Sequence, residues 1–171
     1  MSFHLMTVLE INHIDKNGKI LYKNSNLKNI LHKEGEEYIL KALFGGISLV
    51  QKYYIGLDTR SVLDVNDGFF DIPSVESSGQ GYSRQEVPNT NFTVTMTSGI
   101  NGRFQANSPI VIFRSTANNW SARNIFLATA LSGATQGTRK LISSVPLGSN
   151  LVISEGELVT MRIGLALQTS N

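Results

Sequence analysis

The most regular hydrophobic pattern in the chain lies in residues 91–97, NFTVTMT. Phe92, Val94 and Met96 alternate there with three threonines, so polarity changes at every residue. Side chains that alternate with a period of two lie on opposite faces of a β-strand. We therefore expect a strand in which Phe92, Val94 and Met96 face the core of a sheet while the threonines face outward.

Strand patterns recur on both sides of that stretch. Residues 3–14 and 19–23 flank Asn17-Gly18, and this dipeptide is the strongest short signal for a β-hairpin. Residues 110–113 and 125–129 are continuously apolar, which predicts strands buried on both faces. Further strands are expected at 52–57, 81–87, 141–145 and 159–167, with turns at 99–102, 118–119, 133–137 and 148–150. This regular spacing predicts an all-β fold, an antiparallel β-sandwich of about ten strands.

One segment, residues 29–44, has the pattern of an α-helix. Its apolar residues recur at helical spacing, and three glutamates stand in its first turns, where the helix dipole favours negative charge. Gly45-Gly46 provides a C-terminal end. Gly35 inside the helix costs up to about 1 kcal/mol relative to alanine, so we expect it to contact a strand closely. The predicted fold class is therefore mainly β, with an N-terminal β-hairpin and one α-helix.

Length and composition predict one domain. A chain of 171 residues with 41% hydrophobic residues can bury a core, and it is too short for two comfortable domains. We expect a single β-sandwich domain over residues 1–171. Within it, residues 1–46 form a hairpin-plus-helix subregion, and residues 58–80 form a long loop.

Composition also argues against several functions. The chain has no cysteine, which excludes disulfides, thiolate metal sites and cysteine nucleophiles. The net charge is only +2 and no dense run of Lys and Arg occurs, so we expect no nucleic-acid partner. No apolar run approaches the roughly 20 residues of a membrane span. Residues 1–9 lack the basic flank and apolar centre of a signal peptide, so none is expected.

The sequence offers no recognisable catalytic arrangement. His4, His13 and His32 all lie near the N-terminus, and we interpret them as surface or hydrogen-bonded core imidazoles rather than metal ligands. A nucleophilic serine needs a base and an exposed turn, and the motif G-x-S-x-G is absent. We therefore predict no catalytic, cofactor-binding or metal-binding residue and no enzymatic activity.

The long loop 58–80 is the segment with the most open interpretation. It carries five acidic residues, and loops of this length are usually functional, partner-contacting or mobile. An acidic pair for sugar cleavage is disfavoured because the chain is too small for the large scaffold such enzymes use. Residues 64–68, DVNDG, do not fit the EF-hand spacing, because glycine takes the fifth ligand position. We interpret them as a polar turn, with a bound cation as the alternative.

Aromatic residues provide a possible ligand surface. The candidates for a sugar-binding face are Tyr53, Tyr54, Phe69, Phe70, Tyr82 and Trp120. The pair Phe69-Phe70 is unusual because it lies in a polar loop. Three interpretations stay open for this pair: packing beneath the loop, an anchor for a protein partner, or a ligand contact.

Four segments, in this order, resemble small virion proteins of tailed bacteriophages, the tail-fiber-like or minor structural proteins. Residues 29–38, NILHKEGEEY, are similar to the group's N-L-I-x-N-x-G entry to a helix, and residues 53–57, YYIGL, to its Y-x-G-L strand. Residues 79–85, GQGYSRQ, look like its G-x-G-Y-x-R strand entry, in which Gly81 permits a backbone geometry that other residues resist. Residues 119–129, NWSARNIFLAT, resemble its strand that opens with tryptophan.

The resemblance implies a function in particle assembly. It implies a tail, fiber-anchor or neck component that forms a homo-oligomer, a trimer or ring, and binds other virion proteins. The protein is then expected in the phage particle, after assembly in the host cytoplasm, without a cofactor. The alternatives are a head decoration protein of the capsid and a carbohydrate-binding module that recognises a host glycan.

The matching segments also carry structural expectations. Tyr82 can bury its ring while its hydroxyl stays paired. Arg84 is a forked donor for loop carbonyls or for a carboxylate such as Asp58 or Asp71. Trp120 is expected to cap one end of the sandwich.

Overall fold

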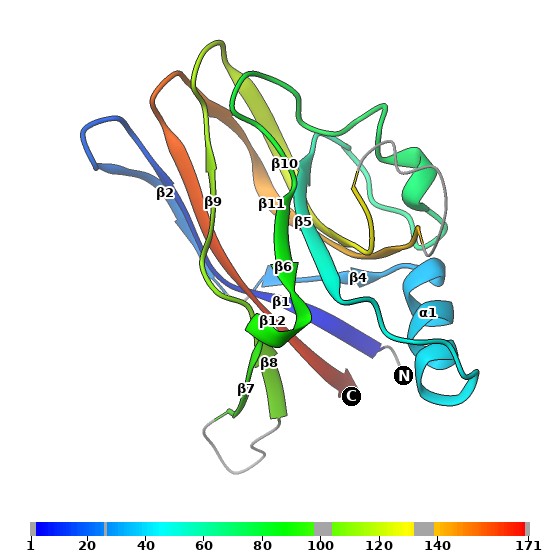
Figure 1. The fold of residues 1–171 in the computed structure, drawn as a ribbon. Coiled ribbons are helices and arrows are strands. Elements are labelled where there is room, and N and C mark those ends of the chain that lie inside the picture. Colours follow the sequence, from blue (N-terminus) through cyan, green and yellow to red (C-terminus); the bar gives the residue numbers. More distant parts are fainter. Residues whose placement is uncertain (1–2, 26, 98–103, 132–138, 170–171) are drawn as a thin grey trace.

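The computed structural model describes residues 3–25, 27–97, 104–131 and 139–169. These residues form two antiparallel sheets and one α-helix, which confirms the predicted fold class (Figure 1). The strands are β1 (Phe3–Ile14), β2 (Ile20–Asn24), β3 (Leu27–Lys28), β4 (Ile30–Leu31), β5 (Lys52–Asp58), β6 (Gln85–Pro88), β7 (Thr93–Met96), β8 (Phe104–Asn107), β9 (Val111–Arg114), β10 (Trp120–Ala128), β11 (Leu141–Ile153) and β12 (Leu158–Thr169). The predicted turns at 99–102 and 133–137 lie outside the described residues.

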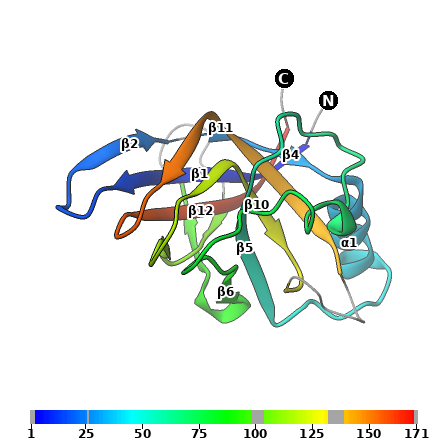
Figure 2. The same ribbon diagram turned by 90° about the horizontal axis from the view of Figure 1, so that it is seen from above.

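The larger sheet has the order β2-β1-β12-β8-β7, with β3 paired to β1 and β9 paired to β12. The smaller sheet has the order β4-β11-β10-β5-β6. The first and last long strands, β1 and β12, pair along almost their whole length and lie side by side in both views (Figure 2). The predicted N-terminal hairpin is present as β1 and β2, with Gly18 at a φ of +86° in its turn. The hairpin is therefore built into the larger sheet through β12.

A core of aliphatic and aromatic side chains fills the space between the sheets. Its fully buried members include Ile11 of β1, Leu57 of β5, Phe113 of β9 and Ile163 of β12. Each large side chain buried in this way stabilises the fold by roughly 1.5–3 kcal/mol. Burial of alternating residues from both sheets is the feature that makes the two layers one folding unit.

The two continuously apolar stretches differ in burial. The prediction of two buried faces is confirmed for β10, where all residues from Ile125 to Ala128 are buried. It is wrong for 110–113, because Ile110 and Ile112 are about half exposed. The long loop accounts for this difference in burial. Its Phe69 packs against Phe126 on the outer face of β10. No described segment buries Ile112 of β9, which is about half exposed.

The helix α1 (Lys33–Phe44) begins four residues later than predicted. Residues Ile30 and Leu31 instead form β4, which pairs with β11 and so carries the chain along the sheet before the helix starts. The close contact expected at Gly35 is confirmed, since a Cβ added there would lie 2.2 Å from the carbonyl oxygen of Ile142 on β11.

Within the described residues, no helix is long and apolar enough to cross a membrane.

Two further strand boundaries differ from prediction. The strand expected at 81–87 is the shorter β6, and Gly81 before it has a φ of +87°, the geometry expected of a glycine. The strand expected at 141–145 continues to Ile153, so the turn predicted at 148–150 is an irregularity inside β11 instead. Pro146 and Leu151 both pair with β10, which shows that the intervening residues bulge out of the ladder.

Within residues 91–97, the predicted burial of the apolar residues is confirmed only for Phe92. Phe92 packs against the core, edge to face with Tyr53 at a centroid distance of 6.0 Å. Val94 and Met96, however, are 65% and 66% exposed, so the prediction that they are buried is wrong. Their strand β7 is at the edge of the larger sheet, and β6, the nearest edge strand of the smaller sheet, contains only four residues.

Candidate functional site

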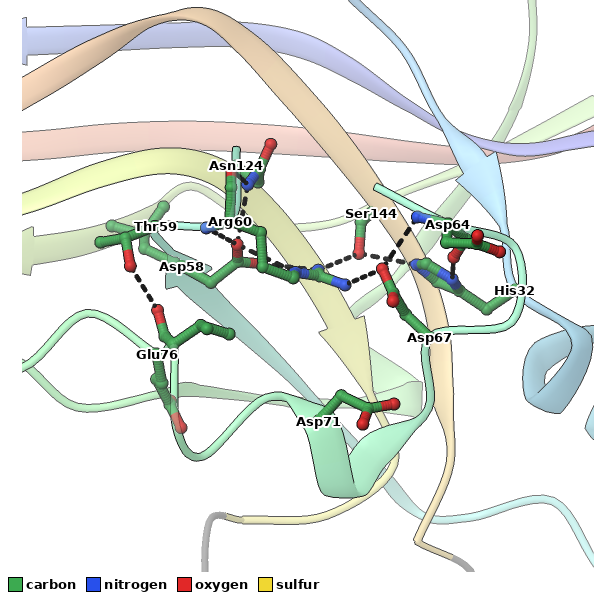
Figure 3. Close-up of polar contacts among 12 residues, drawn as sticks. His32, Asp58, Thr59, Arg60, Asp64, Asp67, Asp71, Glu76, Asn124 and Ser144 are labelled. Carbon is green, nitrogen blue, oxygen red and sulfur yellow. Dashed lines mark hydrogen bonds and ion pairs between the residues drawn. The ribbon is translucent and has the colours of Figure 1, made fainter. Parts of the chain in front are cut away.

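A buried ion pair fixes the start of the long loop on the smaller sheet (Figure 3). Asp58 is the last residue of β5 and is fully buried, and Arg60 follows after one residue. Arg60 donates from Nε and Nη2 to the two carboxylate oxygens of Asp58, at 3.1 and 2.7 Å. Its Nη1 donates to Asp67 Oδ2 at 2.7 Å, so one guanidinium joins two points of the loop. The planar fork of arginine suits this double contact.

Asn124 completes the surroundings of Asp58. Its Nδ2 donates to Asp58 Oδ1 and to the carbonyl of Arg60, both at 2.7 Å, from the middle of β10. The backbone N–H of Arg60 also donates to Asp58 Oδ1, at 3.0 Å. A buried carboxylate is costly unless it is paired and hydrogen-bonded. The donors around Asp58 meet that requirement and hold the loop against the sheet.

His32 extends this network toward the helix. Its Nε2 lies 2.8 Å from Ser144 Oγ on β11, and its Nδ1 lies 2.9 Å from the carbonyl oxygen of Asp64. Burial lowers the pKa of His32, and the positive charge of Arg60 lowers it further, so the imidazole is neutral near pH 7. A carbonyl can only accept, so Nδ1 carries the hydrogen and Nε2 accepts from the Ser144 hydroxyl. Ser144 in turn accepts from Arg60 Nη2 at 2.7 Å.

This pair resembles the serine and base of a nucleophilic enzyme only in distance. His32 and Ser144 are both fully buried, and a nucleophile must reach its substrate. The Ser144 oxygen already accepts from Arg60, and the second nitrogen of His32 faces a carbonyl rather than an orienting carboxylate. The geometry is that of a saturated structural hydrogen-bond chain. It agrees with the interpretation of His32 as a hydrogen-bonded core imidazole.

The other two histidines are placed differently. His13 is buried, and its Nε2 lies 2.9 Å from Glu157 Oε2, so it too is a hydrogen-bonded imidazole. His4 lies on β1, and its side chain is outside the described part of the structure. The described histidines therefore lie in separate hydrogen-bonded positions.

A second buried network holds the end of the loop. Arg84 donates from Nε and Nη2 to the two oxygens of Glu76, each at 2.8 Å, and from Nη1 to the carbonyl of Ala130 at 2.7 Å. The Tyr82 hydroxyl donates to Glu76 Oε1 at 3.0 Å and accepts from the backbone N–H of Leu57 at 2.9 Å. Burial raises the pKa of the Tyr82 hydroxyl well above its usual range. The forked role of Arg84 and the paired hydroxyl of Tyr82 match their predictions.

The carboxylate that pairs with Arg84 is not one of those predicted. Asp58 is occupied by Arg60, and Asp71 accepts from the backbone N–H of Gly68 at 2.7 Å. Glu76 takes the place instead, because its backbone bridges to Asp58 and carries its side chain toward Arg84. The sequence alone does not show which of the five acidic residues of the loop pairs with Arg84.

The stretch 64–68 has the geometry of a polar turn. Asp64 Oδ1 accepts from the backbone N–H and from the Nδ2 of Asn66, and the first of these bonds is the main cause of its lowered pKa. Asp67 is occupied by Arg60 and by the backbone N–H of Asp64. Among the described residues, no three His, Asp or Glu side chains come together as potential metal ligands.

The aromatic residues do not assemble into an exposed face. Trp120 and Phe69 are buried, and Tyr82 packs between Phe113 and Trp120 at centroid distances of 5.8 and 5.5 Å. Only Phe70 of the open pair Phe69-Phe70 is largely exposed, with the Arg139 guanidinium 4.5 Å from its ring centre. Phe69 therefore packs beneath the loop, whereas Phe70 lies on the protein surface. The hypothesis of a sugar-binding face built from these residues is not supported.

Comparison with known proteins adds no family. No family model, no curated protein and no solved structure matches the chain.

Proposed function

We propose that this protein is a non-enzymatic structural component of a tailed-phage virion, a tail, fiber-anchor or neck protein that acts through protein–protein assembly. The observation that carries the proposal is the exposure of large apolar side chains on a surface with few charges. Val94, Met96, Phe104, Phe44 and Phe70 are each about two-thirds exposed or more, in a chain with only 16% charged residues. The first three lie together on the β7–β8 hairpin, and contiguous apolar exposure of this kind marks protein interaction surfaces.

The polar networks support the same proposal. The charged side chains of the long loop that could serve chemistry are largely occupied by one another and by the sheet, as in the pairs Arg60–Asp58 and Arg84–Glu76. A loop fixed in this way is a rigid surface, and rigid surfaces lose little conformational entropy when they bind. Phe70 stands exposed on this loop and provides an apolar contact point.

Composition supports permanent contacts as well. Neutral Ser, Thr and Asn side chains cost less to remove from water than charges do. Broad contacts with other virion proteins and with further copies of the chain are therefore favoured over contacts with nucleic acid or a membrane. The resemblance of four segments to minor phage structural proteins is the reason for placing the assembly in a phage particle.

The test is the content of purified particles. Tailed particles are induced from the cell that carries this gene, purified on a density gradient, washed in high salt and quantified by mass spectrometry. We expect the chain in a fixed ratio to the tail proteins and in the tail fraction after heads and tails are separated. Recovery in the head fraction would favour the decoration alternative. Absence from particles whose other virion proteins are detected would overturn the proposal.

A further inference from the structure

The β7–β8 hairpin carries an uncovered apolar face, which we call the apolar ledge. It consists of Val94 and Met96 on β7 and their partners Ala106 and Phe104 on β8. Directly opposed residues of an antiparallel pair lie on the same face of the sheet. Val94, Met96 and Phe104 are 65%, 66% and 71% exposed, so most of this face is open to water.

The apolar ledge continues the core face of the larger sheet. Ala106 is opposite Leu165 of β12, and Leu165 packs against the core. Phe92, which lies immediately before β7 and two residues before Val94, packs on Tyr53. The apolar alternation of a buried strand therefore continues through Val94 and Met96, although no other part of the described chain covers these two side chains.

β7 is also an open edge. It is the last strand in the order of the larger sheet, and among the described strands it pairs only with β8 (Figure 1). Proteins usually protect such edges with lysine, proline, a bulge or a covering segment. The sequence of β7, Thr-Val-Thr-Met, contains no charge and no proline. Its register with β8 has no irregularity.

We propose that the occupant of this edge is a second copy of the chain, with β7 paired antiparallel to the partner's β7 about a two-fold axis at Thr95. This inference rests on the proposed function, in which the protein acts by assembly, and it names the contact. The register centred on Thr95 places Val94 opposite Met96 of the partner subunit. Apolar residues thereby meet on one face of the joined sheet and threonines meet on the other.

The absence of charge and the alternation of β7 identify a second copy as the partner. In this register a charge at the two-fold axis would meet its own copy, and β7 carries no charge at any position. The alternation of residues 93–97 is the same in both directions about Thr95, so each apolar residue meets an apolar residue of the copy and each threonine meets a threonine. A two-fold contact closes after two copies. The expected unit is therefore a dimer, rather than the trimer or ring that the resemblance implies.

The first test joins the two copies covalently. The chain has no cysteine, so Thr95→Cys introduces a single thiol at the predicted axis. Opposed residues in an antiparallel pair have Cα atoms about 4.5 or 5.5 Å apart, which is within the range for a disulfide. Mild oxidation should give a dimer on a non-reducing gel that reduction dissociates. The matched control is Ser149→Cys, an exposed position on β11, and it should stay monomeric on the gel.

The second test measures solution mass by light scattering over a hundredfold range of concentration. We expect a concentration-dependent dimer for the natural chain and a monomer for Val94→Glu, which places two acidic side chains in the joined apolar face. The control is Val62→Glu, the same substitution at a valine that is 77% exposed in the long loop, and it should keep the dimer. At a concentration low enough for the natural chain to be monomeric, both variants should unfold at its midpoint, because neither valine is buried in one chain.

Three results would overturn the inference: a monomer at the highest concentration, an oligomer that Val94→Glu leaves intact, or Thr95→Cys that crosslinks no better than Ser149→Cys. Such results leave the proposed function standing if the chain is found in tailed particles. A crosslinked dimer that is absent from particles would have the opposite meaning, since the contact would be real and the phage assignment wrong.

Discussion

Removal of the guanidinium of Arg60 is the sharpest test of how the long loop is held. In Arg60→Met, the fully buried carboxylate of Asp58 loses both charge-assisted bonds, at 3.1 and 2.7 Å. Among the described residues it keeps the amide of Asn124 and one backbone N–H as donors. Asp67 and Ser144 each lose a donor as well.

The magnitude follows from burial. Breaking a buried ion pair by removing one partner costs about 3–5 kcal/mol, because the remaining charge has no compensation. The matched control is Lys52→Met, which breaks the Lys52–Glu86 pair at 2.7 Å. Both of its side chains are roughly half exposed, and water screens such surface pairs, so they contribute little to stability. Both variants remove one positive charge from an ion pair with a shortest distance of 2.7 Å, so the difference between them reflects the burial of Arg60 and its further bonds to Asp67 and Ser144.

The assay is urea unfolding followed by tryptophan fluorescence, since Trp120 is the chain's single tryptophan and is buried in the core. We expect Arg60→Met to lose about 3–5 kcal/mol of unfolding free energy. The double variant Asp58→Asn/Arg60→Met should be more stable than the sum of its single variants predicts, by about 1–3 kcal/mol, because the pair interacts directly. A loss for Arg60→Met within 1 kcal/mol of that for Lys52→Met would refute the reasoning.

Three further predictions concern backbone contacts and pH. Gly35→Ala should lower the unfolding free energy by about 1–3 kcal/mol despite its better helix propensity, because its Cβ would meet the Ile142 carbonyl at 2.2 Å; an unchanged urea midpoint would contradict this. Gly81→Ala should cost at least about 1 kcal/mol, since φ is +87° and the Cβ would lie 2.3 Å from the Arg114 carbonyl oxygen; thermal unfolding measures it, and a variant as stable as the natural chain would refute it. The pKa of His32 is lowered on folding, so the unfolded chain takes up the proton first and stability falls as the pH drops below about 6.5, by at most about 1.4 kcal/mol per pH unit. His32→Gln should flatten the stability profile between pH 6.5 and 5, and an unchanged slope would show that another group titrates.

Several features could be predicted because they depend on short stretches of chain. Alternation at 91–97 identified a strand and its apolar face, and Asn17-Gly18 identified the hairpin turn. Gly35 inside a helix implied a close contact, since only a neighbouring backbone explains a residue that costs helix stability. Arg84 was expected to be a forked donor to loop carbonyls or to a carboxylate, because a guanidinium has several donors in one plane, and it donates to both Glu76 and the Ala130 carbonyl.

The candidate site could be predicted only in part, because its partners come from distant segments. His32 and Ser144 are 112 positions apart, and no local pattern indicates that β4 and β11 bring them together. The choice of Glu76 as the partner of Arg84 likewise depends on how the loop folds back onto β5. Folding in three dimensions decides such pairings, because the desolvation of a charge depends on everything around it.

The sequence by itself determined the alternation of most of the long strands, the C-terminal end of the helix and the residue types available for hydrogen bonding, because these follow from interactions within a few residues. Only the tertiary structure decided which of the patterned faces is covered. Val94 and Met96 have the alternation of buried residues, yet the smaller sheet ends before it reaches them. Alternation shows that a face is apolar, whereas burial requires a second surface, and the position of that surface is a property of the whole fold.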